Sequence, residues 1–270
     1  MINLVNFIYE SGICLAILFS LYWLFLRKET YFRFNRYYLL GITVVACLLP
    51  LVNLSLSPFV SEGSIPQMAE AIRLPDVTFA EGTNHQSGLA VWHSVPLAIY
   101  LFGSSLLMLR IILGMIKIYI LKRRGRKTCF EGYSIVHIKQ KIAPFSFFRT
   151  IYINDALIDK GDKSCVISHE LIHIRQKHTY GNLFVEILLA IFWFNPIMWL
   201  LRGALRDTHE YLADNGVLKK TTSRNDYQSL LLKHLNGLLP IVVTNSFNST
   251  IKKRIKMMYR SKSSVFAKLK

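Results

Sequence analysis

Three long apolar segments dominate the N-terminal part of the chain. They run from Leu4 to Leu26, from Tyr37 to Leu56 and from Val91 to Leu109. Each is close to the roughly 20 residues with which a helix crosses about 30 Å of hydrocarbon. The first lacks the basic leader and the small-residue cleavage site of a signal peptide, and a second apolar segment follows it closely. The pattern therefore predicts an α-helical membrane protein with three transmembrane helices.

The pattern changes beyond the third apolar segment. Residues 110–121 place Arg110 and Lys117 among Ile, Leu and Met, which indicates an amphipathic continuation of the same helix. Short alternating runs at 133–138 and 150–153 predict the strands of a small sheet, and a helix is expected to follow as far as about His178. The second half of the chain should therefore be a mainly α, α+β domain, whose sheet can offer an edge strand to a peptide.

Composition agrees with a membrane protein and orients it. Apolar residues make up 52% of the 270 residues, and the formal net charge is +17. Basic residues gather between the first two spans and directly after the third, whereas the stretch between spans two and three is acidic. Because basic loops stay in the cytoplasm, the N-terminus and the acidic loop should face outward, and everything after Lys122 inward. Topology and the anionic lipid headgroups of the bilayer then explain the basic excess, and no direct nucleic-acid partner is expected.

The sequence HELIH at residues 169–173 carries the candidate chemistry. Positions four apart lie on one face of a helix, so His169 and His173 can hold one metal ion. Glu170, beside the first histidine, can take a proton from a water that the metal activates. HExxH is a signature of zinc peptidases, and it predicts a metalloendopeptidase with Zn2+ as its cofactor.

A catalytic zinc site needs a third protein ligand. Glu210 and Asp214 lie four residues apart in another predicted helix. We expect Glu210 to bind the metal and Asp214 to accept the second ring proton of a ligand histidine. An ordinary charged helix face is the alternative for this pair. His178, His209 and Tyr211 are candidates for stabilising the oxyanion of the tetrahedral intermediate.

An apolar segment from Leu183 to Leu201 lies between the two halves of this site. A single membrane crossing is excluded, because the two histidines and Glu210 must all lie within about 2.2 Å of one ion. Asn195-Pro196 supplies a helix break, and Glu186 favours shelter by protein over bare lipid. The segment is therefore either a buried helix pair packed on the catalytic helices or a shallow hairpin that dips into the membrane.

Five separate stretches of the chain resemble the BlaR/MecR-type family of bacterial membrane metallopeptidases, which belongs to the gluzincin class. They are 26–36 (LRKETYFRFNR), 144–148 (PFSFF), 169–178 (HELIHIRQKH), 193–199 (WFNPIMW) and 209–214 (HEYLAD). An HExxH box followed by Asn-Pro-x-x-Trp and ExxxD at this spacing is a highly specific combination.

The resemblance implies a multi-pass protein of the bacterial inner membrane with three spans and a cytoplasmic zinc peptidase region, usually followed by a fourth span and an external sensor domain. On that pattern His169, His173 and Glu210 are zinc ligands, Glu170 is the general base and Asp214 orients a ligand. A ligand sensed outside activates the peptidase, which cleaves itself or a repressor and so releases transcription of resistance genes.

The expected organisation has five parts. Residues 1–57 form two transmembrane helices with a basic cytoplasmic loop, 58–90 an extracytoplasmic loop, 91–127 the third transmembrane helix and its amphipathic extension, 128–258 the zinc metallopeptidase domain and 259–270 a basic tail. A fourth span and a sensor domain do not occur before Lys270, so either the sensing part is truncated or sensing belongs to something else. Self-cleavage at Ser246–Phe247, in a predicted loop rich in Thr, Asn and Ser, is a further hypothesis.

The leading hypothesis is a membrane-embedded zinc metalloendopeptidase that works on the cytoplasmic side as a signal transducer, with itself or a transcriptional repressor as its protein substrate. A quality-control protease for damaged membrane proteins is one alternative, and a non-catalytic receptor or scaffold is another. Glu170 argues against the scaffold, because a pseudo-enzyme has no need for that carboxylate. The sequence leaves open the substrate, the stimulus and whether the chain forms a homo-oligomer.

Overall fold

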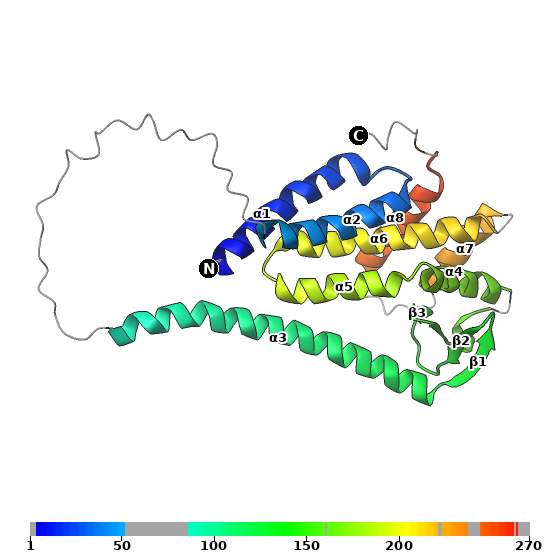
Figure 1. Cartoon of the computed structure of the whole chain (residues 1–270). Coiled ribbons are helices and arrows are strands. Elements are labelled where there is room, and N and C mark those ends of the chain that lie inside the picture. Colours follow the sequence, from blue (N-terminus) through cyan, green and yellow to red (C-terminus); the bar gives the residue numbers. More distant parts are fainter. Residues whose placement is uncertain are drawn as a thin grey trace, which may run out of the picture.

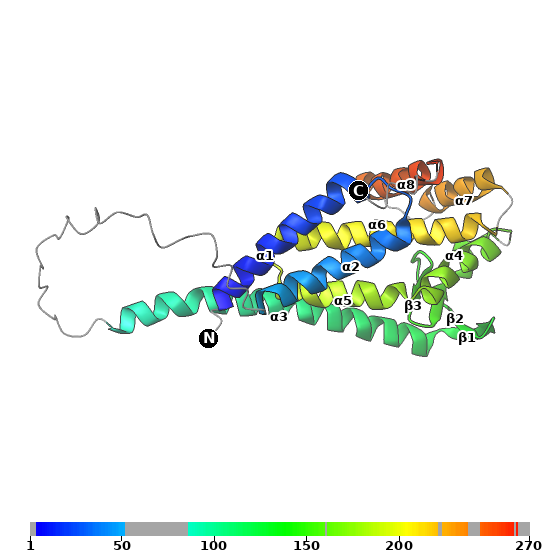
Figure 2. The ribbon, with the colours of Figure 1, turned by 45° about the horizontal axis from the view of Figure 1, so that its top comes forward.

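The computed structural model describes residues 4–51, 86–159, 161–220, 223–236, 244–261 and 263. It is mostly helical, with one small sheet at one end, and its long helices run side by side (Figure 1, Figure 2). The predicted fold class, a mainly helical protein with a small sheet, is confirmed at this level.

Two apolar helices at the N-terminus pack as an antiparallel pair. α1 covers Leu4–Leu21 and continues into a π-helical turn, η1 (Tyr22–Leu26), while α2 covers Phe32–Leu48 and ends in a 3-10 turn, η2 (Leu49–Leu51). In the first turn of α2, the Asn35 side chain donates to the carbonyl oxygen of Leu26 at 2.9 Å. This bond ties the end of η1 to the start of α2 across the basic turn.

α3, Gln86–Arg124, begins the next described part of the chain. Among the described residues, one stretch, Val95–Arg124, is a helix long and apolar enough to cross a membrane, and its most apolar window is not buried in protein. Length and composition therefore support the third predicted span, and the helix continues unbroken through the predicted amphipathic extension. The spans at Leu4–Leu26 and Tyr37–Leu56 stay predictions, and most of the predicted loop 58–90 lies outside the described residues.

A four-stranded sheet with the order β1-β2-β4-β3 follows α3. The strands are β1 (Arg126–Phe130), β2 (Tyr133–His137), β3 (Phe145–Phe147) and β4 (Thr150–Ile153). Glu131 and Gly132 join β1 to β2 with positive φ at both positions, which matches the twist of a hairpin. β2 and β4 pair in parallel, and β3 pairs antiparallel to β4. The two predicted strands, β2 and β4, are confirmed as the centre of the sheet.

The last turns of α3 pack on this sheet. Ile118 and Leu121 lie against Val136 and Tyr152. A Cβ on Gly125, at the corner between α3 and β1, would lie 2.2 Å from the Val136 side chain. The close corner therefore requires glycine, and it attaches the sheet to the candidate membrane helix.

The remaining described helices are α4 (Lys163–Arg175), α5 (His178–Ile191), α6 (Pro196–Leu218), α7 (Arg224–Asn236) and α8 (Thr244–Met258), with a 3-10 turn, η4 (Asp155–Leu157), before α4. Lys177 takes a left-handed conformation with φ 56°, which separates α4 from α5. The Asn195 side chain accepts a bond from the N–H of Ile197 at 2.9 Å, and Pro196 occupies the first turn of α6. Both are favoured at a helix start, and the predicted break is confirmed.

α5 and α6 form a hairpin that packs on α1, α2 and α3 as well as on α4 (Figure 1, Figure 2). At its tip, the Phe192 ring lies 6.5 Å from that of Phe7 in α1, and Trp193 Nε1 donates to the carbonyl oxygen of Tyr100 in α3 at 3.3 Å. A Cβ on Gly103 would lie 2.6 Å from the Trp193 ring, so a glycine is needed there. Residues 183–201 are therefore a helix pair and not a single crossing.

Glu186 lies inside this hairpin and has two cationic partners on α6. Its Oε1 lies 2.5 Å from Arg202 Nε and 3.3 Å from Arg206 Nη2. The expectation that protein shelters this carboxylate is confirmed.

α6 joins two hydrophobic clusters. The first unites α1, α2 and α5 with the N-terminal half of α6, and includes Leu39, Leu189, Leu201 and Leu205. The second unites the sheet, α4, α7 and α8 with the C-terminal half of α6, and includes Ile151, Leu171, Ala213 and Val217. The polar residues of α6 between Leu205 and Ala213 lie at this junction, and with them lies the candidate site.

Candidate metal centre

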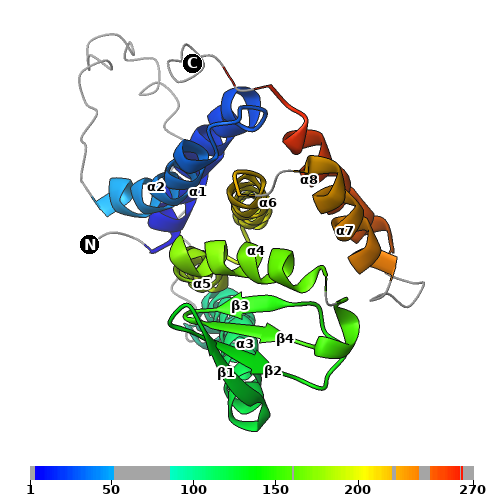
Figure 3. The ribbon, with the colours of Figure 1, turned by 90° about the vertical axis from the view of Figure 1, so that its right-hand side faces the viewer.

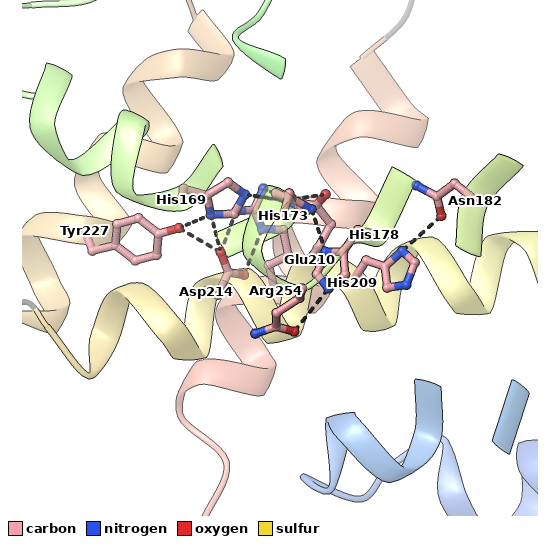
Figure 4. A network of polar contacts seen from close by, with 10 residues as sticks. His169, His173, His178, Asn182, His209, Glu210, Asp214, Tyr227 and Arg254 are labelled. Atoms are coloured by element: carbon pink, nitrogen blue, oxygen red, sulfur yellow. Dashed lines mark hydrogen bonds and ion pairs between the residues drawn. The ribbon is translucent and has the colours of Figure 1, made fainter. Parts of the chain in front are cut away.

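α4 and α6 bring the predicted metal ligands together. His169 and His173 lie one turn apart on α4, Glu210 lies on α6, and the three side chains converge (Figure 4). The two helices pack closely, since a Cβ on Gly216 of α6 would lie 2.6 Å from Ile172 of α4. In the described part of the chain, this is the one group of three or more His, Cys, Asp or Glu residues whose ligand atoms all lie within 4.8 Å of one another.

The distances between these ligand atoms fit one small ion. The two histidine Nε2 atoms are 3.1 Å apart; Oε2 of Glu210 lies 3.5 Å from Nε2 of His169, and Oε1 of Glu210 lies 3.7 Å from Nε2 of His173. A tetrahedral zinc ion with bonds of about 2.0–2.1 Å separates its ligands by roughly 3.3 Å. Two imidazoles and a carboxylate are also a donor set of catalytic zinc sites, which leave the fourth position open. The residues therefore fit a zinc ion.

The local charges favour an ionised Glu210. Burial raises the pKa of its carboxyl group, but the bond to His169 and the charge of Arg254 outweigh burial and hold the pKa well below its ordinary value. Burial and the neighbouring His169 lower the pKa of His173. Burial also opposes protonation of His169, yet the bond to Glu210 raises its pKa overall. A carboxylate and neutral imidazoles are the forms that bind a metal.

Glu170 lies in the same turn of α4 as the two histidines. Its side chain is buried, and its charge acts on His173. The predicted general base thus stands beside a candidate ligand, in surroundings with little water.

Tyr227 and Asp214 hold the His169 ring from behind. Nδ1 of His169 lies 2.8 Å from the Tyr227 hydroxyl, whose O–H donates to Oδ1 of Asp214 at 2.8 Å. Asp214 itself lies 3.5 Å from Nδ1. The Nδ1–H group of His169 therefore donates to the tyrosine oxygen, which leaves the Nε2 lone pair for a metal. The orienting role predicted for Asp214 is shared with a tyrosine of α7 that no motif indicated.

Arg254 of α8 binds both carboxylates of α6. Its Nη2 and Nε lie 2.5 and 2.9 Å from Oδ1 and Oδ2 of Asp214, and its Nη1 lies 3.1 Å from Oε2 of Glu210. Burial opposes the charge of Arg254, but Asp214 raises its pKa above the ordinary value. Asp214 is only 2% exposed, and a buried carboxylate is tolerated only with such partners. α8 is therefore part of the site, although no sequence signal marked Arg254.

Two of the three candidates for oxyanion stabilisation lie behind His173, and the third packs against α2. Nδ1 of His178 lies 2.8 Å from Nδ1 of His173, on the ring edge opposite the metal-facing Nε2. His209 stacks on His178 with ring centroids 4.0 Å apart, and both rings are 1% exposed. These positions contradict an oxyanion role for the two histidines, because both are buried behind a ligand. The Tyr211 ring packs against Phe32 of α2 instead.

The proposed self-cleavage position also differs from its prediction. Ser246 and Phe247 lie in the first turn of α8 and not in a loop. Cleavage there would require the helix to unwind, because a peptide that binds by strand addition is extended.

The comparisons with known proteins point to the same region. Residues 146–258, from β3 to the end of α8, match the family model described as BlaR1 peptidase M56. A search among curated proteins found no match. The matched region contains His169, His173 and Glu210, and also Tyr227 and Arg254.

Proposed function

On the match of residues 146–258 to the BlaR1 peptidase M56 family model, we propose that the protein is a membrane-embedded zinc metalloendopeptidase of the BlaR/MecR type. His169, His173 and Glu210 would hold the zinc ion. One observation carries the proposal: one ligand atom from each of the three side chains, on two helices, lies within 4.8 Å of the other two, as a shared metal ion requires.

A bound zinc ion supplies a Lewis acid that polarises the peptide carbonyl and makes a water nucleophilic near neutral pH. Glu170 takes the proton of the attacking water and delivers it to the nitrogen of the leaving amine as the C–N bond breaks. Tyr227 fixes the His169 ring through its 2.8 Å contact. Arg254 keeps Glu210 ionised and in place through its 3.1 Å contact.

β3 is the candidate strand for peptide binding. Within the described residues it pairs with β4 alone, and it packs against α4, whereas the other edge strand, β1, lies across the sheet (Figure 3). A peptide that adds to the outer edge of β3 would lie extended beside the HExxH helix. Strand addition recognises backbone groups and needs no chain end, which supports endopeptidase action.

The position of the site supports a cytoplasmic active centre. Tyr211, next to Glu210, packs against Phe32, the first residue of α2, with ring centroids 5.4 Å apart. The site therefore shares one end of the molecule with the basic turn that contains Arg27 and Lys28 and with Arg33 at the start of α2. Because basic loops stay in the cytoplasm, we assign the catalytic region to the inner face of a bacterial cell membrane and the N-terminus to the outside.

Exposed apolar side chains support a multi-pass arrangement. Large apolar residues are exposed on α1, α2, α3 and both helices of the hairpin, among them Ile17, Val45, Phe102, Phe184 and Trp199. Water-exposed surfaces rarely carry so much contiguous apolar area. A bilayer that covers these helices would place the α5–α6 hairpin at membrane depth.

A signalling role, with a repressor or the chain itself as substrate, draws its support from the family resemblance. Protease assays on the purified protein distinguish it from the quality-control alternative. Broad cleavage of casein would support quality control, whereas cleavage confined to a repressor-type protein or to the chain itself would support signalling.

Metal analysis of purified variants tests the peptidase proposal. The wild type and Glu170→Gln should each bind one zinc ion per chain, whereas His169→Ala and Glu210→Gln should lose it. Hydrolysis should fall by about 10²–10⁴-fold in Glu170→Gln, the usual contribution of a general base. Asp155→Asn changes a carboxylate on η4 that pairs with Lys163, and should leave metal and activity unchanged. Full activity in Glu170→Gln, or a metal-free wild type, would refute the proposal, and signalling that survives this change would favour the scaffold.

A further inference from the structure

We propose that His178 is a positioning residue for the metal ligand His173, and that His209 holds the His178 ring in place. The inference rests on the proposed zinc site and assigns a role that the HExxH and ExxxD motifs do not contain. His178 touches Nδ1 of His173 at 2.8 Å, while Nε2 of His173 faces Nε2 of His169 at 3.1 Å. His178 therefore acts on the ligand from the side opposite the metal position.

Hydrogen-bond partners determine which nitrogen of each ring carries a proton. The side-chain oxygen of Gln176 lies 3.1 Å from Nε2 of His178 and can only accept, so this nitrogen is protonated and donates. Nδ1 of a neutral His178 is then an acceptor, and it receives the Nδ1–H of His173. His173 is left with an unprotonated Nε2, which is the form that binds a metal. Gln176 and His178 together hold His173 in the tautomer of a ligand.

His209 restrains the face of the His178 ring. The two rings lie 4.0 Å apart at an interplanar angle of 7°. Nδ1 of His209 lies 2.9 Å from Oδ1 of Asn182 on α5, and it donates because an amide oxygen only accepts. With Gln176 and His173 at its two nitrogens and His209 on its face, the His178 ring cannot rotate without breaking a contact.

α2 also packs beside the stacked rings of His178 and His209. Leu40 of α2 and Cε1 of His209 both lie within 3.7 Å of the position that a Cβ on Gly181 would take. Helices α2, α4, α5 and α6 thus all contribute to the surroundings that fix His173.

Two replacements of His178 in the full-length protein separate its hydrogen bond from its bulk. In His178→Asn the amide oxygen occupies the position of Nδ1 and still accepts the proton of His173, whereas in His178→Phe a ring stacks on His209 but accepts nothing. Zinc affinity is measured by competition with a chelator, and the visible spectrum of Co2+-loaded protein reports the ligand geometry. The Phe variant should bind zinc about 10–100-fold more weakly and the Asn variant within about threefold of wild type, since an orienting partner carries this much metal affinity.

Equal zinc affinity of His178→Phe and the wild type overturns the inference, and so does an equal loss in both variants. If the Phe variant does not fold, Gln176→Met removes the acceptor that fixes the His178 tautomer. This variant should weaken zinc binding by at least about threefold, and unchanged affinity overturns the inference. His137→Phe on β2 is a matched histidine control that should bind zinc as the wild type does. A wild type that binds no zinc refutes the proposed function, whereas zinc-binding wild type with an unaffected His178→Phe refutes only this step.

Discussion

Replacing Arg254 with methionine tests how the charges of the site are held together. Arg254 is the cation that meets both Asp214 and Glu210, with three contacts of 2.5–3.1 Å. Methionine keeps much of the aliphatic stem but offers no donor. Asp214 would keep only the 2.8 Å bond from Tyr227 and the more distant His169. The variant therefore leaves a buried carboxylate without a counter-charge.

The expected loss of stability follows from the burial of the Arg254–Asp214 ion pair. The side chains of Arg254 and Asp214 are 12% and 3% exposed, so solvent screens their interaction little. Removing one partner of a buried ion pair costs about 3–5 kcal/mol. In a protein of this size about 1 kcal/mol corresponds to roughly 2–4 °C in melting temperature. Metal-free Arg254→Met should therefore melt roughly 6–20 °C below the wild type.

Lys253, the preceding residue on α8, provides the matched control. It pairs with Asp207 at 2.8 Å, but its side chain is 44% exposed, and an exposed pair contributes only about 0–1 kcal/mol. Thermal melting in detergent, followed by circular dichroism, compares the two methionine variants. A double variant, Arg254→Met with Asp214→Asn, should melt higher than the sum of the two single losses predicts, because the unpaired charge is then gone. Equal melting of Arg254→Met and Lys253→Met, or additive losses in the double variant, would show that the buried pair does not stabilise the fold.

Three further predictions concern stability, each measured by thermal melting of the metal-free protein. Folding lowers the pKa of His209 from 6.5 to about 3, mainly through burial, so below pH 6.5 the unfolded chain binds a proton that the native ring does not. The free energy of unfolding should therefore fall by about 1.4 kcal/mol per pH unit toward pH 3. The dependence of melting on pH should be shallower in His209→Phe. Gly103→Ala would place a Cβ 2.6 Å from Trp193 and should lower the free energy of unfolding by about 1–3 kcal/mol. Gly114→Ala on the same helix meets nothing within 4 Å and should not lower it. Equal melting temperatures of the two variants would contradict the packing argument. Lys177 has φ 56°, so Lys177→Gly should melt at or above the wild type, while Lys177→Val should lose about 1–2 kcal/mol; an unaffected valine variant would contradict the left-handed turn.

The ligand set could be predicted because its signal is local. His169 and His173 share one helical turn, and so do Glu210 and Asp214, so a period of 3.6 residues is enough to place each pair on one helix face. The convergence of the two turns was required by the chemistry of one ion, and not by any pattern between them. Tyr227 and Arg254 could not be predicted in this way. Their contacts depend on where α7 and α8 fold back onto α4 and α6, and a single tyrosine or arginine has no periodic signal.

Hydropathy has a different limit, which the α5–α6 hairpin shows. The apolar run at 183–201 has the composition of a membrane span, but composition does not record what covers each side of a helix. The structure divides the run at Asn195 and packs its two halves on three other apolar helices. The signals that did identify this arrangement were chemical. They were the helix break at Pro196, the carboxylate of Glu186, and the need for both ends to reach one ion.

The same packing makes the geometry of the site depend on the apolar helices. α6 contacts α1 and α2 with its N-terminal half and carries Glu210 in its C-terminal half, about 20 Å from Pro196 at 1.5 Å per residue. Its tip is held where Trp193 covers Gly103 of α3, and α2 closes the wall behind His178 and His209. A packed interior does not deform gradually. If α2 or α3 shifts against the hairpin, these contacts either resist the shift or transmit it. A transmitted shift would move Glu210 and the His173 ring relative to His169. The closest nitrogen and oxygen atoms of the three ligands are 3.1–3.7 Å apart, so a small displacement of one ligand would lengthen its bond to a shared ion. Such a shift of the helices should therefore be detected first as a change in metal affinity.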